Sequence, residues 1–591
     1  MRDVIVIGSG GGGPVVAKEL AARGLNVLMI EAGPRNDKIE ETWTHFEDDQ
    51  NNLFKGKLRA GPTDRARTSW FRETPQKSYI TQISGVGGTT AHYFGNSPRA
   101  MPGCFNDYQG ADKGLFDTAH LFPFGYRELV PYYDWVEKTL PVQTAAMGLK
   151  EQVFFKGCEG VGLPVQTVKD TYTDAFRPQE NAILQPQGNA GKSTNAAMLR
   201  YPQAQGCTFC GYCYQGCNEP MKSPANLKAK RSTNTSYVPM ALTADLWSPG
   251  GKAVTLISDA YVTKIHSTTE NGQLVAKGVT WRDTVTGAKY TEDAKVVVMA
   301  GGCIEDPRLW LNSGLPNPNG WVGRGLTDHA LDWVTGIMPY DTNSSKGPAS
   351  AARADFPGLG CVENVGLPPA LQALTASFSD SGVRGAYDAG LGETGPWTGQ
   401  AGRAQGHEIK EVLDNVNRVL NVLVLTDDDV ESQNLVSLSN IFPADEHGPI
   451  PKVEIAKRTR SRRTLENRRK LAERAANILK AAGATKIIRL DFAPLLLHVQ
   501  SSMRMGENPA DSVLDANAEA RYVKRLFVAD NAALANACGG MNPTLSNQAL
   551  STRTAEKIFQ LYFGGSPWVG RETPLSSIDD RVTQAVIQRG V

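Results

Sequence analysis

Four closely spaced cysteines are the first residues in this sequence that could do chemistry. They lie in GCTFCGYCYQGCNEP (206–220), where Cys207, Cys210, Cys213 and Cys217 follow the pattern C-x2-C-x2-C-x3-C. Thiolates at this spacing can surround an iron–sulfur cluster, as in the bacterial ferredoxin run, although the proline that follows that run is missing here. Zinc usually takes two separated pairs of ligands, and disulfides are rare in a reducing compartment. The spacing favours a 3Fe-4S or 4Fe-4S cluster, with structural thiols, zinc and disulfides as the alternatives.

A glycine-rich turn near the N-terminus could bind a dinucleotide. Residues 3–31, DVIVIGSGGGGPVVAKELAARGLNVLMIE, read as a strand, a turn, an amphipathic helix and a second strand, which is a βαβ unit of a parallel sheet. Gly8, Gly10 and Gly13 form G-x-G-x-x-G, a pattern that allows a tight turn, close approach to a pyrophosphate and close helix packing. The helix N-terminus favours the anion, and Glu31 is placed to bond a ribose. A glycine turn without a ligand is the alternative.

Four further blocks continue this organisation along the chain. The last is predicted to be a strand ending at Asp530, a loop, and a helix opened by Asn542 and Pro543, because proline is favoured in the first helical turn. The blocks are ISGVGGTTAHYFGNSPR (83–99), VVVMAGGCIEDPRLWLNSG (296–314), GWVGRGLTDH (320–329) and LFVADNAALANACGGMNPTLSNQALSTRTAEKIF (526–559).

In this order, together with HVQSSMRMG (498–506), the blocks resemble the glucose-methanol-choline (GMC) flavoprotein oxidoreductases over about residues 3–563. The resemblance implies an α/β fold, with a Rossmann-like FAD-binding lobe and a substrate lobe built on a mixed or antiparallel sheet. It also implies FAD rather than NAD. Beyond the glycine turn and Glu31, the matched positions expected near FAD are Gly87, Gly88, Thr89, His92, Asn96, Val262, Ala300, Gly301, Asp530, Asn542 and Pro543.

Oxidation of an alcohol needs a hydride acceptor and a base. No side chain accepts a hydride, so flavin N5 must do so, and a neutral histidine is suited to take the hydroxyl proton. The family motif assigns the base to His498 and the second catalytic position to Asn542, which can bond the substrate oxygen but cannot be the base. In some sugar-oxidising relatives, a histidine at the offset of His92 carries FAD covalently through the 8α-methyl. The alternative is a histidine packed beside the flavin, and His329 is read as structural.

The cysteine run fits two branches of this family. Multi-subunit sugar and polyol dehydrogenases carry a cluster here that passes electrons to a haem partner, and they typically show an adjacent cysteine pair and then C-x3-C. Cys213 and Cys217 keep the C-x3-C, whereas the adjacent pair is absent. Long-chain alcohol oxidases show CGxCxxGC, which this chain also fits as CGYCYQGC.

We therefore predict the large subunit of an iron–sulfur-containing sugar or polyol dehydrogenase. It would oxidise a CH–OH group of a sugar, glycoside, polyol or other alcohol and pass electrons through the cluster. A small chaperone-like subunit and a haem or other acceptor are the expected partners. The alternatives are a cluster-free alcohol oxidase that uses O2 and a flavin-binding electron-transfer subunit.

The chain of 591 residues is too long for one simple core. Residues 340–406 read as long loops, and 457–482 as a basic amphipathic helix with a solvated face. The predicted layout is 1–100, first part of the FAD lobe; 101–195, substrate-lobe segment and lid; 196–330, second part of the FAD lobe; 331–490, substrate lobe; 491–563, C-terminal catalytic part; and 564–591, surface tail.

Composition and charge exclude several classes of protein. The chain has 41% hydrophobic residues and a net charge of +1, which gives no sign of nucleic-acid or anionic-membrane binding. No apolar run is long enough to predict a transmembrane helix. The first strand begins at Asp3 and leaves no room for a leader. We expect a cytoplasmic protein, or one exported to the periplasm with a signal-bearing partner.

Overall fold

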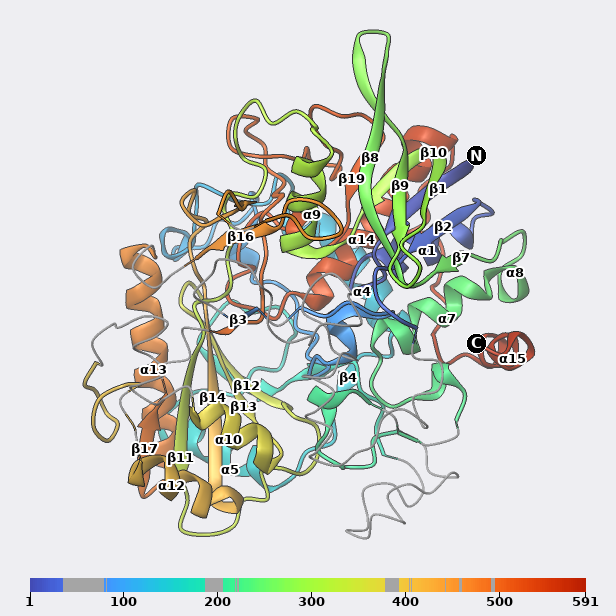
Figure 1. Ribbon diagram of the computed structural model, residues 1–591. Coiled ribbons are helices and arrows are strands. Elements are labelled where there is room, and N and C mark those ends of the chain that lie inside the picture. The colour runs from blue at the N-terminus through green and yellow to red at the C-terminus, as the bar shows by residue number, and fades with distance from the viewer. Residues whose placement is uncertain are drawn as a thin grey trace.

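Two sheets organise the chain in the computed structural model, one in each lobe (Figure 1). The structure describes residues 1–35, 79–80, 82–186, 206–217, 219–220, 223–377, 393–402, 404, 406–441, 443–455, 460–490 and 495–591.

The first sheet has a parallel centre and an antiparallel extension. Its order is β7-β2-β1-β10-β9-β8, and β19 also pairs with β10. The C-terminal half of β10 lies between β1 and β19 in parallel, while its N-terminal half pairs with β9 in the antiparallel β8–β9 ribbon. The strands are β1 (Arg2–Ile7), β2 (Val27–Ile30), β7 (Thr255–Ile257), β8 (Ala260–Glu270), β9 (Gln273–Asp283), β10 (Lys289–Met299) and β19 (Leu526–Val528).

Both faces of this sheet are covered, which explains the continuous apolar strands of the sequence. On β1, Val4 and Val6 pack in one core with α1 (Gly13–Ala21), whereas Ile5 and Ile7 belong to the core on the other face. The helix α14 (Thr544–Phe563) lies beside α1 and α4 (Tyr126–Thr139). The glycine turn between β1 and α1 therefore opens at the carboxyl edge of the sheet, where ligands bind in open α/β folds.

The second sheet is antiparallel throughout, in the order β17-β11-β14-β13-β12-β5. The helices α13 (Arg462–Ala482) and α5 (Leu149–Gly160) cover one face, and α10 (Pro369–Ser377) and α12 (His407–Asp414) lie toward the other (Figure 1). The strands are β5 (Ala175–Pro178), β11 (Asp332–Ile337), β12 (Ala352–Phe356), β13 (Gly360–Val365), β14 (Val419–Thr426) and β17 (Lys486–Arg489).

The prediction of long loops over 340–406 is wrong for much of that region, because β12, β13 and α10 lie within it. The strands carry Arg353, Asp355 and Glu363, which are fully buried. Charged residues are almost never fully buried unless they are paired. The charges at these positions therefore made the segments read as exposed loops rather than as buried strands. The predicted α/β fold is confirmed, and the sheet predicted as mixed or antiparallel is antiparallel.

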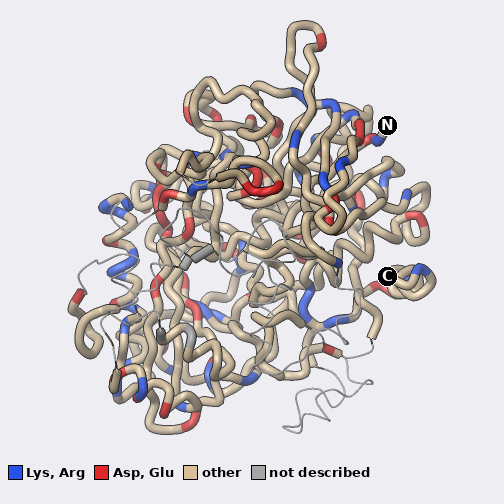
Figure 2. Tube along the Cα trace, viewed as in Figure 1, with Lys and Arg blue, Asp and Glu red and all other residues tan. Residues whose placement is uncertain are grey.

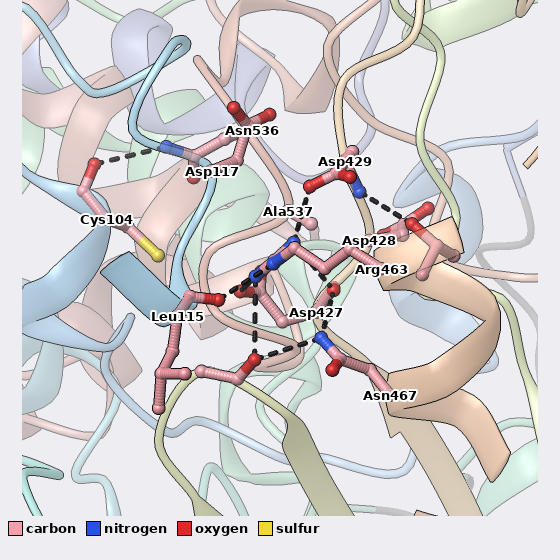
Figure 3. Close-up of polar contacts among 12 residues, drawn as sticks. Cys104, Leu115, Asp117, Asp427, Asp428, Asp429, Arg463, Asn467, Asn536 and Ala537 are labelled. Atoms are coloured by element: carbon pink, nitrogen blue, oxygen red, sulfur yellow. Dashed lines mark hydrogen bonds and ion pairs between the residues drawn. The ribbon is translucent and has the colours of Figure 1, made fainter. Parts of the chain in front are cut away.

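The basic helix α13 does not simply present a solvated face. Arg463 reaches Asp427 and Asp429 and donates to the carbonyl oxygen of Leu115, and Asn467 donates to the carbonyl oxygen of Gly358 (Figure 3). Part of its positive charge therefore fastens the helix to the loop after β14. Ser461 caps the start of α13 by accepting from the N–H of Thr464, and Gly483 ends it in the left-handed conformation.

Short elements complete the fold. The C-terminal helix α15 (Asp580–Arg589) buries Val582 and Val586 against Met240 of α7 (Tyr237–Leu242). Lys and Arg are interspersed with Asp and Glu along the chain (Figure 2). Among the described helices, none has the length and apolar character needed to cross a bilayer. The other elements are β3 (Tyr79–Ile80), β4 (Gln143–Thr144), β6 (Glu180–Asn181), β15 (Leu435–Leu438), β16 (Pro451–Glu454), β18 (Leu495–Leu496), α8 (Ala244–Trp247), α9 (Gly302–Asn312), and the 3-10 turns η2 (Gly88–Ala91), η3 (Pro102–Cys104), η4 (Lys113–Leu115), η5 (Cys213–Gln215), η6 (Ala225–Leu227), η7 (Thr233–Thr235), η8 (Val416–Arg418) and η10 (Asn531–Ala533).

Candidate active site

One cavity brings together most of the residues that the sequence singled out. It runs along the glycine turn, the second glycine loop, β8, the β10–α9 turn and the start of α14. Gly13 and Gly87 are not among its lining residues. The predicted residues that line the cavity are Gly8, Gly10, Glu31, Gly88, Thr89, His92, Asn96, Val262, Ala300, Gly301, His498, Asp530, Asn542 and Pro543.

The glycine turn leaves space for a ligand because its glycines have no side chains. Gly8 has φ +101°, and a Cβ there would lie 2.2 Å from the carbonyl oxygen of Ala300. A Cβ on Gly13 would lie 2.1 Å from the carbonyl oxygen of Gly8, so this glycine lets α1 approach the strand. Gly10 lines the cavity, and a Cβ on it would meet no described atom within 4 Å. The residues fit the pyrophosphate of a dinucleotide at the helix N-terminus.

Glu31 lies in the cavity wall with both carboxylate oxygens engaged. Oε2 accepts from the N–H and hydroxyl of Ser9 at 2.9 and 2.7 Å, and Oε1 accepts from the N–H groups of Gly33 and Gly85 at 2.9 and 3.0 Å. Burial raises the pKa of Glu31, and these hydrogen bonds oppose that effect. The carboxylate holds the two glycine loops together, and its contact with a ribose stays a prediction.

A second acidic pair stands at the β10–α9 turn. Asp530 accepts from the N–H groups of Gly302 and Ala532 at 2.6 and 2.7 Å, and Asp306 accepts from the N–H of Gly301 at 2.9 Å. Burial together with the charge of nearby Asp530 raises the pKa of Asp306 well above its usual range. The sequence motif indicated Asp530 but not its partner.

His498 is held in place by two residues of the VGRGLTDH block. Its backbone N–H donates to Asp328 Oδ1 at 2.9 Å, and its Nδ1 lies 3.2 Å from Nδ1 of His329. Its ring is partly exposed to the cavity. Desolvation, with His329 and Arg353 nearby, lowers the pKa of His498 well below its usual range. His498 is therefore neutral at physiological pH, as a general base must be.

Asn542 is oriented by charged side chains of the substrate sheet. Arg353 Nη1 donates to Asn542 Oδ1 at 3.1 Å and to Glu363 Oε1 at 3.1 Å. Arginine has no acceptor, so this contact assigns the Asn542 oxygen to Arg353. The NH2 group, which carries two hydrogens, is the donor of Asn542 toward Glu363. Burial raises the pKa of Glu363 to about 7, while Arg353, Asn542 and Asn96 oppose that shift. No motif indicated Arg353 or Glu363.

His92 faces both the cavity and the cysteine-rich loop. Its Nδ1 donates to the carbonyl oxygen of Tyr214 at 2.9 Å. Beside it, the Nζ of buried Lys230 donates to the carbonyl oxygens of Ala91, Tyr93 and Cys213 at 2.8, 2.9 and 2.7 Å. Burial lowers the pKa of Lys230 to about 8. Lys230 therefore connects the expected flavin-facing loop to the cysteine-rich loop through hydrogen bonds. The sequence gave no reason to select this lysine.

The four clustered cysteines line one small cavity with Lys230. All nine cysteines of the chain are described, and each has a free thiol. Burial, and then neighbouring thiols, raise the pKa of Cys207 and Cys210. Within the described ranges, no three or more His, Cys, Asp or Glu side chains form a group that could hold a metal ion, so a zinc site finds no support. The four thiols line one cavity, but their arrangement gives the iron–sulfur cluster no support either, so the cluster stays a prediction.

Comparisons with known proteins agree with this geometry. Two models of the GMC oxidoreductase family match the chain, over residues 176–331 and 431–551. A 2-methyl-1,2-propanediol dehydrogenase of Mycolicibacterium austroafricanum is 28% identical and covers 94% of this chain and 95% of its own. Paromamine 6'-oxidase of Streptomyces fradiae is 26% identical over 94% and 91%, and the fructose dehydrogenase large subunit of Gluconobacter japonicus is 25% identical over 94% and 97%.

A crystal structure of formate oxidase has the same fold, with a TM-score of 0.59 at 14% identity over 95% of this chain and 99% of that one. The similar proteins include dehydrogenases and oxidases, so they do not select the iron–sulfur branch. The motifs, the fold and both family models lead to the same conclusion. Over both matched segments, the chain is similar to the GMC oxidoreductases.

Proposed function

We propose that this protein is an FAD-dependent oxidoreductase that oxidises a CH–OH group of a sugar, glycoside, polyol or other alcohol. The observation that carries the proposal is the position of neutral His498 and oriented Asn542 on the wall of the cavity formed by the glycine turn. When bound there, FAD supplies the hydride acceptor that the side chains lack.

Each of the two residues has one task. His498 takes the hydroxyl proton of the substrate on a ring nitrogen, because its lowered pKa keeps it unprotonated. Asn542 donates from its NH2 group to the substrate oxygen, since its own oxygen already accepts from Arg353. A donor at that oxygen stabilises the negative charge that develops as the proton leaves.

The experiment is anaerobic mixing of the FAD-loaded protein with candidate alcohols, followed by the flavin absorbance. The panel includes 2-methyl-1,2-propanediol and fructose, which the names of the relatives suggest. His498→Ala should keep its FAD and lose about 10²–10⁴-fold in the rate of flavin reduction, the contribution of general acid–base catalysis. A parental rate in this variant would refute the base assignment, and failure of every alcohol to bleach the flavin would favour an electron-transfer subunit.

We further propose that electrons leave through the cysteine-rich loop, where Cys207, Cys210, Cys213 and Cys217 would hold an iron–sulfur cluster that accepts single electrons. The spacing of the four cysteines and the Lys230 link to the expected flavin-facing loop support this path. The large-subunit name of one relative supports a partner subunit and an external acceptor.

Iron and acid-labile sulfide analysis of anaerobically purified protein tests this path. A cluster-free protein that yields one peroxide per substrate oxidised would instead be an oxidase, as the names of other relatives suggest. Flavin that stays with the chain after acid precipitation, and is lost in His92→Ala, would establish the covalent link through His92.

A further inference from the structure

His329 contacts the ring of the expected base, although its motif suggested only a structural role. The Nδ1 atoms of His329 and His498 are 3.2 Å apart. The rings meet edge-on, with their centroids 5.1 Å apart and an interplanar angle of 73°. Since two imidazole nitrogens form a hydrogen bond only if one carries a proton and the other does not, this contact couples the tautomers of the two rings.

The carbonyl oxygen of Ala537 determines which nitrogen of His329 carries the proton. His329 Nε2 lies 3.0 Å from the carbonyl oxygen of Ala537, and a carbonyl only accepts, so Nε2 carries the proton of the neutral ring. His329 Nδ1 is then an acceptor, and His498 Nδ1–H must donate to it. The remaining nitrogen of His498, Nε2, therefore carries no proton.

The amide of Gln500 agrees with this assignment only when its oxygen and nitrogen are exchanged. Its nitrogen is placed 2.7 Å from His329 Nε2, and its oxygen has no hydrogen-bond partner in the described part of the chain. Amide oxygen and nitrogen are interchangeable on steric grounds. With the amide rotated by 180°, the oxygen accepts from His329 Nε2–H and the same tautomer is reinforced.

His329 is held rigidly and in the neutral form. Its φ of +61° is in the left-handed region, which is strained for a residue other than glycine, and its N–H donates to Asp428 Oδ1 at 3.0 Å. Burial, together with Arg353 and Arg460, lowers the pKa of His329 to about 3 against the opposing effect of the Ala537 bond. A neutral, immobile imidazole is a dependable acceptor for the His498 proton.

We propose that His329 is a positioning residue for the alcohol oxidation: by accepting the Nδ1 proton of His498, it holds the tautomer in which His498 Nε2 can take the hydroxyl proton. The inference rests on the proposed function. As the proton moves to Nε2, the substrate O–H bond breaks and its electron pair stays on the oxygen. The resulting imidazolium of His498 keeps its Nδ1–H bond to His329.

Two substitutions of His329 separate this role from a structural one. In His329→Asn, the side-chain oxygen can take the place of Nδ1 as acceptor, and asparagine tolerates the left-handed backbone. His329→Ala removes the acceptor. We expect His329→Ala to lower the limiting rate of flavin reduction in the holoenzyme by about 10–100-fold, as for lost partners of functional histidines, and His329→Asn to recover most of it. His266→Asn, on the β8–β9 ribbon where His266 Nε2 contacts Thr280, is the control.

Histidine nitrogen NMR of the resting, [15N]histidine-labelled holoenzyme reads the tautomer directly. The His498 signal is assigned by its loss in His498→Ala. The Nδ1–H form should dominate in the parent and in His329→Asn but not in His329→Ala. An Nε2–H form in the parent, or a parental rate in His329→Ala, would overturn the inference alone. A parental rate in His498→Ala would overturn the base assignment and the inference together.

Discussion

Gly10 and Gly13 belong to one motif, yet alanine should have different effects at the two positions. A Cβ on Gly13 would lie 2.1 Å from the carbonyl oxygen of Gly8 and 3.2 Å from Cβ of Ala300. A Cβ on Gly10 would meet no described atom within 4 Å, and Gly10 lines the cavity. Gly13→Ala should therefore damage the fold, whereas Gly10→Ala should damage only the binding of FAD.

The magnitudes follow from these distances. Gly13→Ala forces α1 away from the β1 turn, and overpacking of this kind costs about 1–3 kcal/mol of the free energy of unfolding, occasionally more. Gly10 is not in the left-handed region, so alanine there should leave the FAD-free protein unchanged or stabilise it by about 0.4–1 kcal/mol. FAD at about 100 times its dissociation constant should stabilise the parent by about 2.7 kcal/mol, and Gly10→Ala should lose that gain.

The assay combines FAD content after purification with urea unfolding of the FAD-free proteins, repeated with added FAD. Gly114→Ala is the matched control, because a Cβ there also meets no described atom within 4 Å and Gly114 does not line the cavity. Gly114→Ala should keep both the stability and the FAD response of the parent. If Gly10→Ala retains one FAD per chain and the full FAD-induced stabilisation, the placement of the pyrophosphate at Gly10 is wrong.

Two further predictions concern buried charge. Arg353→Met should lower the free energy of unfolding by about 3–5 kcal/mol, because it leaves Glu363 buried without its cation and Asp355 with Arg177 alone. Urea unfolding measures this, and the exposed Arg462→Met should cause no measurable change. Acid should destabilise the protein through His329, whose pKa of about 3 in the folded state lies below the value of about 6.5 in the unfolded chain. Its contribution is complete well above pH 6.5 and falls by about 2.3 kcal/mol between pH 6.5 and 4.5. An equal decrease in His329→Asn would contradict this reasoning.

The cofactor site could be predicted because its requirements are local. The turn, the helix N-terminus and Glu31 lie within one βαβ unit, and each has a sequence signal of its own. His498 and Asn542 were found through their family motifs, and both line the expected cavity. The sequence could not give the partners of these two residues, because His329, Arg353 and Glu363 come from distant segments and reach the site only through the fold.

The strands that sequence reading missed are the ones that hold the amide of Asn542. β12 carries Arg353 and β13 carries Glu363, at fully buried positions where a core strand normally has aliphatic residues. A purely apolar pair at these positions would serve stability at least as well, since a buried ion pair rarely gains over well-packed hydrophobic residues. It would, however, leave the Asn542 oxygen without the donor that fixes its direction. The buried charges on these strands therefore match the proposed role of Asn542 better than the needs of the fold, and functional sites are where local sequence rules are expected to fail.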